Sequence, residues 1–273
     1  MLKDITLGQY FPGNTVVHRL DPRGKILLVF AYIIFIFTIK NFWGYLVLAL
    51  FTFGAILLSK VPPKFVIKGL KPILIFIVIT GLFNLFLTDG EPIFSWWIFT
   101  VTREGVAFAA FMILRLVFLI LGTSLLTLTT SPIALTDGLE QLLSPMKKLG
   151  VPAHELAMMM TIALRFIPTL MEETDKIIKA QSARGADFES GNLLRRAKAM
   201  IPILIPLFIS AFRRADELAT AMECRCYRGG ENRTRLKELR YGRVDLGGLL
   251  VFIALGILLY ALNMLLGPSI GVK

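Results

Sequence analysis

The stretch LGGLLVFIALGILLYALNMLL, residues 246–266, decides the class of this protein. It contains no charged side chain and has the roughly 20 residues that a helix needs to cross a bilayer. The whole chain of 273 residues is also strongly apolar, because 55% of its residues are hydrophobic and 18% are charged. Typical soluble domains are roughly 45–50% apolar and about 25% charged. Together with a mean hydropathy of +0.69, these values predict an all-α, polytopic membrane helical bundle.

Further apolar segments precede this one, and we expect about four spans within residues 1–130. The first is short, but Lys25 and Lys40 could reach the two interfaces and let it cross. Basic residues beside it place the N-terminus in the cytoplasm, and the polar start of the chain shows no cleaved signal peptide. With five spans the tail after residue 266 lies outside, and an additional crossing would reverse that. The predicted N-terminal spans are residues 26–39, 42–59, 72–88 and 106–130.

The connections between these segments carry the charges and the interface aromatics. Lys60 to Lys71 reads as a basic cytoplasmic loop, and Asp89 to Pro92 as an outer loop followed by a Trp-Trp pair. Arg115 lies inside the fourth span. A charge there should face a polar partner in the protein interior or reach the outer interface as a snorkelling side chain, and the sequence leaves both readings open.

Residues 131–245 differ from the rest, because charged residues are frequent and apolar residues are periodic instead of continuous. We predict a cytoplasmic coupling module here, followed by a C-terminal transmembrane helix in residues 246–273. One helix starts at Pro132, a long one runs from Ala153 towards Ser182, and another begins at Asn192. Their apolar parts either dip into the membrane or lie along its surface, and periodicity does not decide between the two.

A motif occurs twice in this module, shifted by 41 residues. DKIIKAQSARG (175–185) and DELATAMECRC (216–226) share Asp, then Ala, then Arg. Each reads as the end of a helix, with Gly185 in the position that follows a helix C-terminus. Small residues flank each arginine in the sequence. An alanine one turn earlier lies on the same helix face as the arginine. Because little bulk surrounds it, each Arg side chain is suited to enter a groove on another protein. The two motifs are Ala183-Arg184-Gly185 and Cys224-Arg225-Cys226.

The composition and motifs exclude several function classes. The net charge of +11 fits the enrichment of Lys and Arg in cytoplasmic loops, and no basic-aromatic pattern indicates a nucleic-acid partner. The two cysteines lack further ligands at zinc spacings, so we expect no metal site and read them as small residues. No phosphate-binding loop and no convergent catalytic group occur. We therefore expect a non-catalytic protein without a cofactor.

On these motifs the chain resembles the transmembrane T component (CbiQ family) of energy-coupling factor (ECF) transporters. The resemblance covers essentially the whole chain, including Ala163–Pro168 and the two Arg motifs, of which the second has cysteines in place of the usual Ala and Gly. It implies a scaffold that links two cytoplasmic ABC-type ATPases to a membrane substrate-binding (S) component in the cell membrane, for uptake of vitamins or other micronutrients. Arg184 and Arg225 would each enter a groove on one ATPase.

Two further expectations concern the partners. The two motif copies differ in charge nearby, which favours two related but non-identical ATPases. Met158, Met159 and Met160 form a flexible apolar surface that suits different S components, or else they pack between long helices. The alternative function is a permease subunit of a conventional ABC importer, which would present one docking helix per subunit instead of two.

Overall fold

The computed structural model describes residues 10–96, 99–150, 152–186, 188, 192–229 and 239–267. These residues fall into two compact units, which we treat separately. The bundle unit has described residues within 8–138 and 238–273, and the module unit has described residues within 139–237. The last helix of the chain therefore groups with the N-terminal helices.

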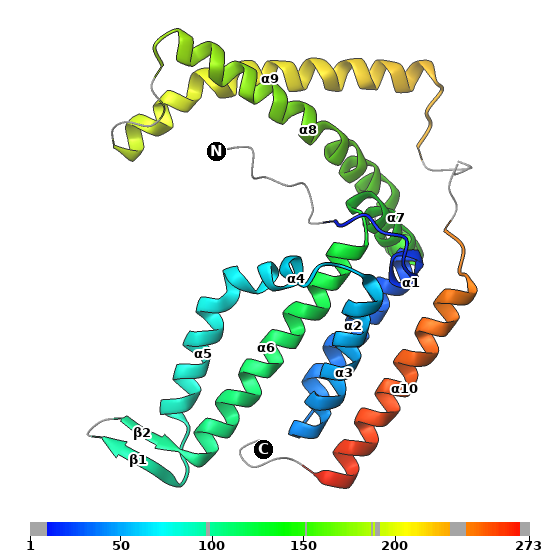
Figure 1. Cartoon of the computed structure of the whole chain (residues 1–273). Coiled ribbons are helices and arrows are strands. Elements are labelled where there is room, and N and C mark those ends of the chain that lie inside the picture. The colour runs from blue at the N-terminus through cyan, green and yellow to red at the C-terminus, as the bar shows by residue number, and fades with distance from the viewer. Residues whose placement is uncertain are drawn as a thin grey trace. The chain divides into compact units, whose positions relative to one another are not determined.

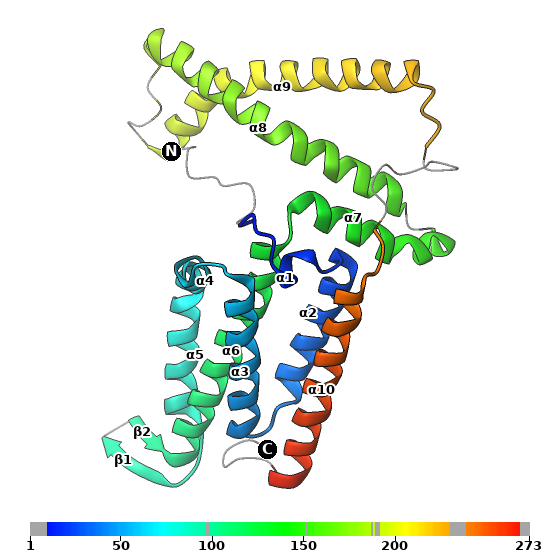
Figure 2. The ribbon, with the colours of Figure 1, turned by 45° about the vertical axis from the view of Figure 1, so that its right-hand side comes forward.

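The bundle unit is helical, with one short hairpin between α5 and α6 among its described residues (Figure 1). Helices α2, α3, α6 and α10 lie side by side, and α5 packs along α6 (Figures 1 and 2). Its elements are α1 (Val16–Arg19), α2 (Pro22–Thr38), α3 (Phe42–Ser59), α4 (Pro63–Leu70), η2 (Lys71–Ile73), α5 (Leu74–Leu87), β1 (Pro92–Trp96), β2 (Phe99–Thr102), α6 (Arg103–Thr129), most of α7 (Pro132–Leu143) and α10 (Arg243–Leu266).

Four helices are long and apolar enough to cross a membrane within the described residues: α3, α4 to α5 taken together, α6, and α10. This confirms the prediction of an all-α polytopic membrane protein. Helix α2 has 17 residues, and its crossing stays a prediction. Many large apolar side chains of these helices are exposed, as expected where lipid is the solvent.

Aromatic residues from α2, α3 and α6 form the centre of the bundle. The Tyr45 ring lies edge-on to Phe111 at 4.8 Å, and Phe118 stacks on its other side. The Tyr32 hydroxyl donates to the Phe118 carbonyl oxygen at 3.1 Å and lies 2.8 Å from the Thr52 hydroxyl. The polar atoms of this centre are therefore paired, which a buried hydroxyl in an apolar bundle requires.

The structure decides between the two readings of Arg115 in favour of an interior partner. Its Nε donates to the Tyr45 hydroxyl at 3.3 Å. The guanidinium also lies 5.2 Å from the centre of the Phe111 ring and 5.4 Å from that of Phe37. Aromatic faces attract a cation at such distances, so the charge is held by the aromatic centre.

Two sequence-based expectations about loops are corrected. The basic stretch before the third span is not a loop, because α4 forms there and buries Val66. Pro63 starts this helix in a position where its missing N–H is harmless. The connection that was predicted to be an outer loop is an antiparallel hairpin of β1 and β2, whose aromatic and β-branched residues favour strands. Trp97 lies outside the described residues.

Lys25 does not extend outward from the bundle unit as expected, because its side chain is buried at 5% exposure. Its Nζ donates to the Thr129 carbonyl oxygen at 2.9 Å, the Thr130 hydroxyl at 3.1 Å and the His18 carbonyl oxygen at 3.3 Å. A cation is favoured at a helix C-terminus, where carbonyl groups lack partners. Lys25 therefore fixes the end of α6, from which the chain continues into α7.

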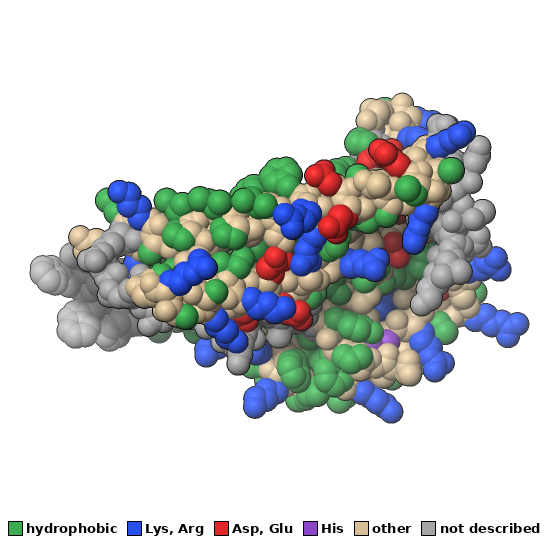
Figure 3. All heavy atoms as spheres, turned by 90° about the horizontal axis from the view of Figure 1, so that it is seen from above, with side chains coloured by type: hydrophobic (Ala, Val, Ile, Leu, Met, Phe, Trp, Pro, Cys, Tyr) green, Lys and Arg blue, Asp and Glu red, His purple; other side chains and the backbone are tan. Residues whose placement is uncertain are grey.

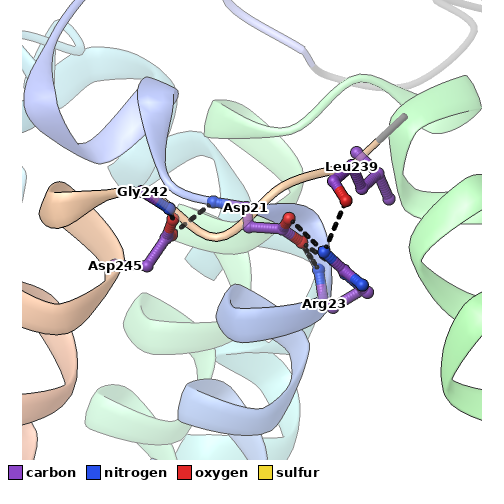
Figure 4. Close-up of polar contacts among 5 residues, drawn as sticks. All are labelled: Asp21, Arg23, Leu239, Gly242 and Asp245. Atoms are coloured by element: carbon purple, nitrogen blue, oxygen red, sulfur yellow. Dashed lines mark hydrogen bonds and ion pairs between the residues drawn. The ribbon is translucent and has the colours of Figure 1, made fainter. Parts of the chain in front are cut away.

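A second set of contacts joins the start of α2 to the start of α10 (Figure 4). Asp245 accepts from the backbone N–H groups of Asp21 and Gly242, both at 2.7 Å. Arg23 binds the Asp21 carboxylate at 2.8 Å and the Leu239 carbonyl oxygen at 2.9 Å. Burial alone would raise the pKa of Asp21, but the hydrogen bonds and charge of Arg23 outweigh it, and the pKa is lowered. The Asp21 carboxylate therefore stays ionised at neutral pH and holds Arg23, whose guanidinium reaches Leu239 in the segment before α10.

The module unit contains two long helices that follow a short turn. Its elements are the end of α7, η3 (Ser144–Leu149), α8 (Ala153–Ala183) and α9 (Leu193–Cys224). Gly150 ends η3 with a positive φ of 85°. The predicted helix starts at Pro132 and Ala153 are confirmed, and the predicted end of the long helix at Ser182 differs by one residue.

Candidate functional site

Both Arg motifs end a helix with the same hydrogen-bond pattern. At the end of α8, the Gly185 N–H bonds the Ser182 carbonyl oxygen at 3.0 Å, and the Ala186 N–H bonds the Gln181 carbonyl oxygen at 3.0 Å. This crossed pair is the Schellman motif, which satisfies carbonyl groups left open at a helix end. The arginine occupies the last, half-helical position before the chain turns away.

The second motif repeats this geometry without glycine. The Cys226 N–H bonds the Glu223 carbonyl oxygen at 2.8 Å, and the Tyr227 N–H bonds the Met222 carbonyl oxygen at 3.0 Å. Arg225 therefore takes the same place on α9 as Arg184 takes on α8. The duplication read from the sequence is a duplication of backbone structure.

The residue after each arginine adopts left-handed backbone geometry. Gly185 has a φ of 87° and Cys226 a φ of 56°. The interpretation of Cys226 as merely a small residue was therefore incomplete. Its position is one that glycine occupies without strain and that other L-residues occupy at a cost of about 1–2 kcal/mol. The helix end is kept, but it is less stable than in the first motif.

Replacing Cys226 by glycine should therefore stabilise the end of α9. We expect Cys226→Gly to gain about 1 kcal/mol and to raise the Tm by about 2–4 °C, with docking and transport unchanged. Cys224→Ala is the matched control, because residue 224 is helical and its replacement should leave the Tm unchanged. A lower Tm for Cys226→Gly would contradict the backbone argument, and a loss of transport would indicate a role for the thiol.

The tips themselves are open to solvent. Ala183, Arg184, Gly185, Cys224, Arg225 and Cys226 are all exposed. Neither arginine side chain makes a hydrogen bond or ion pair to another residue in the part of the chain that the structure describes, and only the backbone N–H groups of the two residues are bonded, to carbonyl oxygens of their own helices. Exposed arginines with small neighbours present a planar fork that can form several directed hydrogen bonds to carboxylate or carbonyl groups.

Helices α8 and α9 cross and contact each other, and each Arg tip lies at the end of one of them (Figures 1 and 2). Arg214 of α9 donates to the carboxylate of Glu173 of α8 at 2.8 Å, across the same 41 residues that separate the motif copies. Arg184 follows Glu173 by 11 residues, and Arg225 follows Arg214 by 11 residues. At about 1.5 Å per residue, each helix extends about 16 Å from the ion pair to its tip.

The methionines proposed for a second interface have unequal exposure. Met159 is 56% exposed and Met160 is 49% exposed, whereas Met158 is half-buried. The most exposed large hydrophobic side chains in the described part of α8 are therefore two of the three that the sequence suggested. Hydrophobic and basic side chains both reach the surface of the molecule in Figure 3.

A larger exposed apolar face lies on α9, in a stretch that the sequence analysis assigned to the membrane or its surface without naming it as a protein interface. Phe208 is 62% exposed and Phe212 is 64% exposed, whereas Ile203 on the other side of the helix is buried. The spacing of three and four residues places these exposed side chains on one face, opposite Arg214. A helical plot of the segment could have found the face. Its exposed members are Ile201, Leu204, Ile205, Phe208, Ile209 and Phe212.

Histidine and acidic residues do not assemble into a metal site among the described residues, where no group of three or more such side chains occurs. His154 Nδ1 lies 2.9 Å from the Glu140 carboxylate, which links α7 to α8. The two free cysteines are exposed on either side of Arg225. The contact between His154 and Glu140 therefore has a structural explanation, because it joins two helices.

Comparison with known proteins agrees with this geometry. The family model described as "CbiQ: Cobalt transport protein" matches residues 13–236. Three similar proteins carry the name energy-coupling factor transporter transmembrane protein EcfT. The protein of Ruminiclostridium cellulolyticum is 60% identical over 245 residues, covering 90% of this chain and 92% of the relative. That of Clostridium kluyveri is 61% identical over 247 residues, covering 90% and 92%.

The protein of Bacillus subtilis is 51% identical over 264 residues, covering 96% of this chain and 100% of the relative. The region matched by the family model includes both Arg-tipped helices and the candidate membrane spans that precede them, α3, α4 to α5, and α6. The chain therefore belongs to the CbiQ family and is a homologue of the transmembrane proteins of energy-coupling factor transporters.

Proposed function

We propose that this chain is the energy-coupling scaffold of its transporter, joining two cytoplasmic ATPases to a membrane S component for uptake of a vitamin or another micronutrient. The observation that carries the proposal is the pair of solvent-exposed Arg tips with one common backbone geometry, each about 16 Å from the Glu173–Arg214 crossing. Two equal docking elements in one chain suit two related receptors.

Each arginine acts as the docking group at its tip. A guanidinium stays charged at any physiological pH and binds planar acceptors with two parallel hydrogen bonds. The flanking residues 183, 185, 224 and 226 are small, so a narrow groove can close around the stem. The ATPases would occupy the cytoplasmic side, where the predicted topology places the module and the N-terminus.

The S component would use the apolar side of the module. Exposed apolar faces of this kind mark protein or membrane interfaces, and those of α8 and α9 carry the methionines and phenylalanines described above. Movement of the ATPases would act on the two tips, and the ion pair at the crossing would transmit it to this apolar side. ATP hydrolysis belongs to the partners, and this chain is a non-catalytic subunit.

The stoichiometry of the purified complex tests the proposal. We expect co-purification from native membranes to give one copy of this chain with two ATPase subunits and one small membrane protein, identified by mass. The two ATPases should be different proteins, because the motif copies differ in charge nearby. Two copies of this chain per ATPase pair would instead indicate a permease of a conventional ABC importer, and a complex without ATPases would reject both.

A further inference from the structure

Two cavities of the bundle unit meet at Lys25. One has a volume of about 580 Å³ and is lined almost wholly by apolar side chains of α2, α3, α6 and α10, which is within the roughly 300–1,000 Å³ typical of ligand sites. The other has about 360 Å³ and is lined by polar groups. Leu20, Lys25 and Thr129 line both, so an apolar compartment adjoins a polar one.

Both cavities lie towards one end of the bundle. Helices α2 and α10 begin at this end, and α3 and α6 finish there. Along α10, the apolar cavity extends from Val244 to Phe252, which is about 12 Å at roughly 1.5 Å per residue. One leaflet contributes about 15 Å of the hydrocarbon core. The apolar cavity is therefore about as long as one leaflet is deep, and the polar cavity adjoins it at the end of the bundle.

The polar cavity has an excess of positive charge. Arg19 and Arg240 line it and are exposed, and the buried Lys25 adds a third cation. Asp21 is the acidic residue among the described lining, and its carboxylate is bound by Arg23. The contacts of Figure 4 also hold Leu239, and with it the adjacent Arg240, at the mouth of this cavity. The cavity therefore complements an anionic group.

We propose that these cavities bind one anionic phospholipid, with its phosphate between Arg19 and Arg240 and an acyl chain in the apolar cavity. The site is amphipathic within a single leaflet, which is the character of a lipid. A helix of a partner protein would run past both leaflets instead. The acyl chain of the bound lipid would fill the space between α10 and the N-terminal helices. Its headgroup would contact residues 129–131, which precede α7, and residues 239 and 240, which precede α10.

Two glycines offer positions from which a larger side chain can be built into the apolar cavity. Gly54 and Gly247 both line it, and a Cβ added at either would have no atom within 4 Å. Gly54→Leu with Gly247→Leu therefore occupies the space of the acyl chain. Arg19→Gln with Arg240→Gln removes two headgroup cations. The matched controls are Ala254→Leu and Arg243→Gln, because both residues lie on α10 and outside the two cavities.

The experiment reconstitutes the full chain in nanodiscs of equal parts dioleoyl phosphatidylglycerol and dioleoyl phosphatidylcholine, and counts retained lipids by native mass spectrometry. We expect about one retained phosphatidylglycerol per wild-type chain. The leucine pair should lose both lipids, and the glutamine pair should lose the preference for phosphatidylglycerol by roughly fivefold for each arginine. Each control should bind as the wild type does.

Three outcomes would overturn the proposal. These are equal retention by the leucine pair and the wild type, no preference for phosphatidylglycerol in the wild type, and a control that loses lipid as fully as its matched variant. Melting curves identify any variant that fails to fold, and the single substitutions then replace it. If lipid retention is unchanged while capture of a membrane partner is lost in the leucine pair, the cavity is a protein-binding site.

Discussion

The double variant Arg184→Glu/Arg225→Glu should lose both ATPases from the membrane complex while the chain itself remains folded and inserted. Both side chains are exposed, so their replacement leaves no buried group without a partner. Removing one member of a charge pair buried at an interface costs about 2–5 kcal/mol, and charge reversal adds repulsion to the acidic groups of the groove. We expect each substitution to weaken ATPase binding by about a hundredfold.

A pull-down on tagged chain with quantified ATPase measures this effect. The matched control is Arg165→Glu/Arg213→Glu, because these arginines are also exposed and lie on the same two helices away from their ends. The control should keep both ATPases. Intact binding by the tip variant would reject the docking role, whereas equal loss in the control would show a general response to charge. Single tip variants report whether one ATPase stays bound without the other.

The double variant Phe208→Asp/Phe212→Asp should lose the S component and keep the ATPases. Both rings are more than 60% exposed on α9, and aromatic anchors at an interface typically contribute 2 kcal/mol or more each. Two buried carboxylates in their place would be unpaired, which raises the cost further. We expect capture of the S component to fall by about a thousandfold, and uptake of its substrate to cease.

Phe208→Leu/Phe212→Leu is the matched control, since it keeps the face apolar and should retain most of the capture. The substitution of Met158, Met159 and Met160 by Asp locates the interface on α8 in the same assay. If the phenylalanine variant binds normally and the methionine variant does not, the S component uses α8 instead of α9. Loss of the ATPases from either variant would contradict the division of the module into tips and an apolar side.

Much of the candidate site could be predicted from the sequence, because a helix end is specified by residues that are close together in the chain. The helix end at Arg184 follows from glycine at residue 185 and small residues around it, and the second copy is visible as a repeat. The sequence pattern around Cys226 did not reveal that its backbone is left-handed, with a φ of 56°. A cysteine adopts left-handed geometry only where the surrounding hydrogen bonds hold it there, and those bonds involve the end of α9 as a folded unit.

The sequence by itself determined the class of the protein, because an apolar segment such as residues 246–266 is stable only as a helix in a bilayer. It also predicted that two helices end at the Arg motifs, as α8 and α9 do. Only the tertiary structure showed which groups the charged side chains contact. Lys25 is buried against the end of α6, Arg115 lies in an aromatic centre, and Glu173 meets Arg214 across the crossing. Sequence spacing cannot give these pairs, because the electrostatic energy of a charge depends on neighbours brought close by the fold and on their burial.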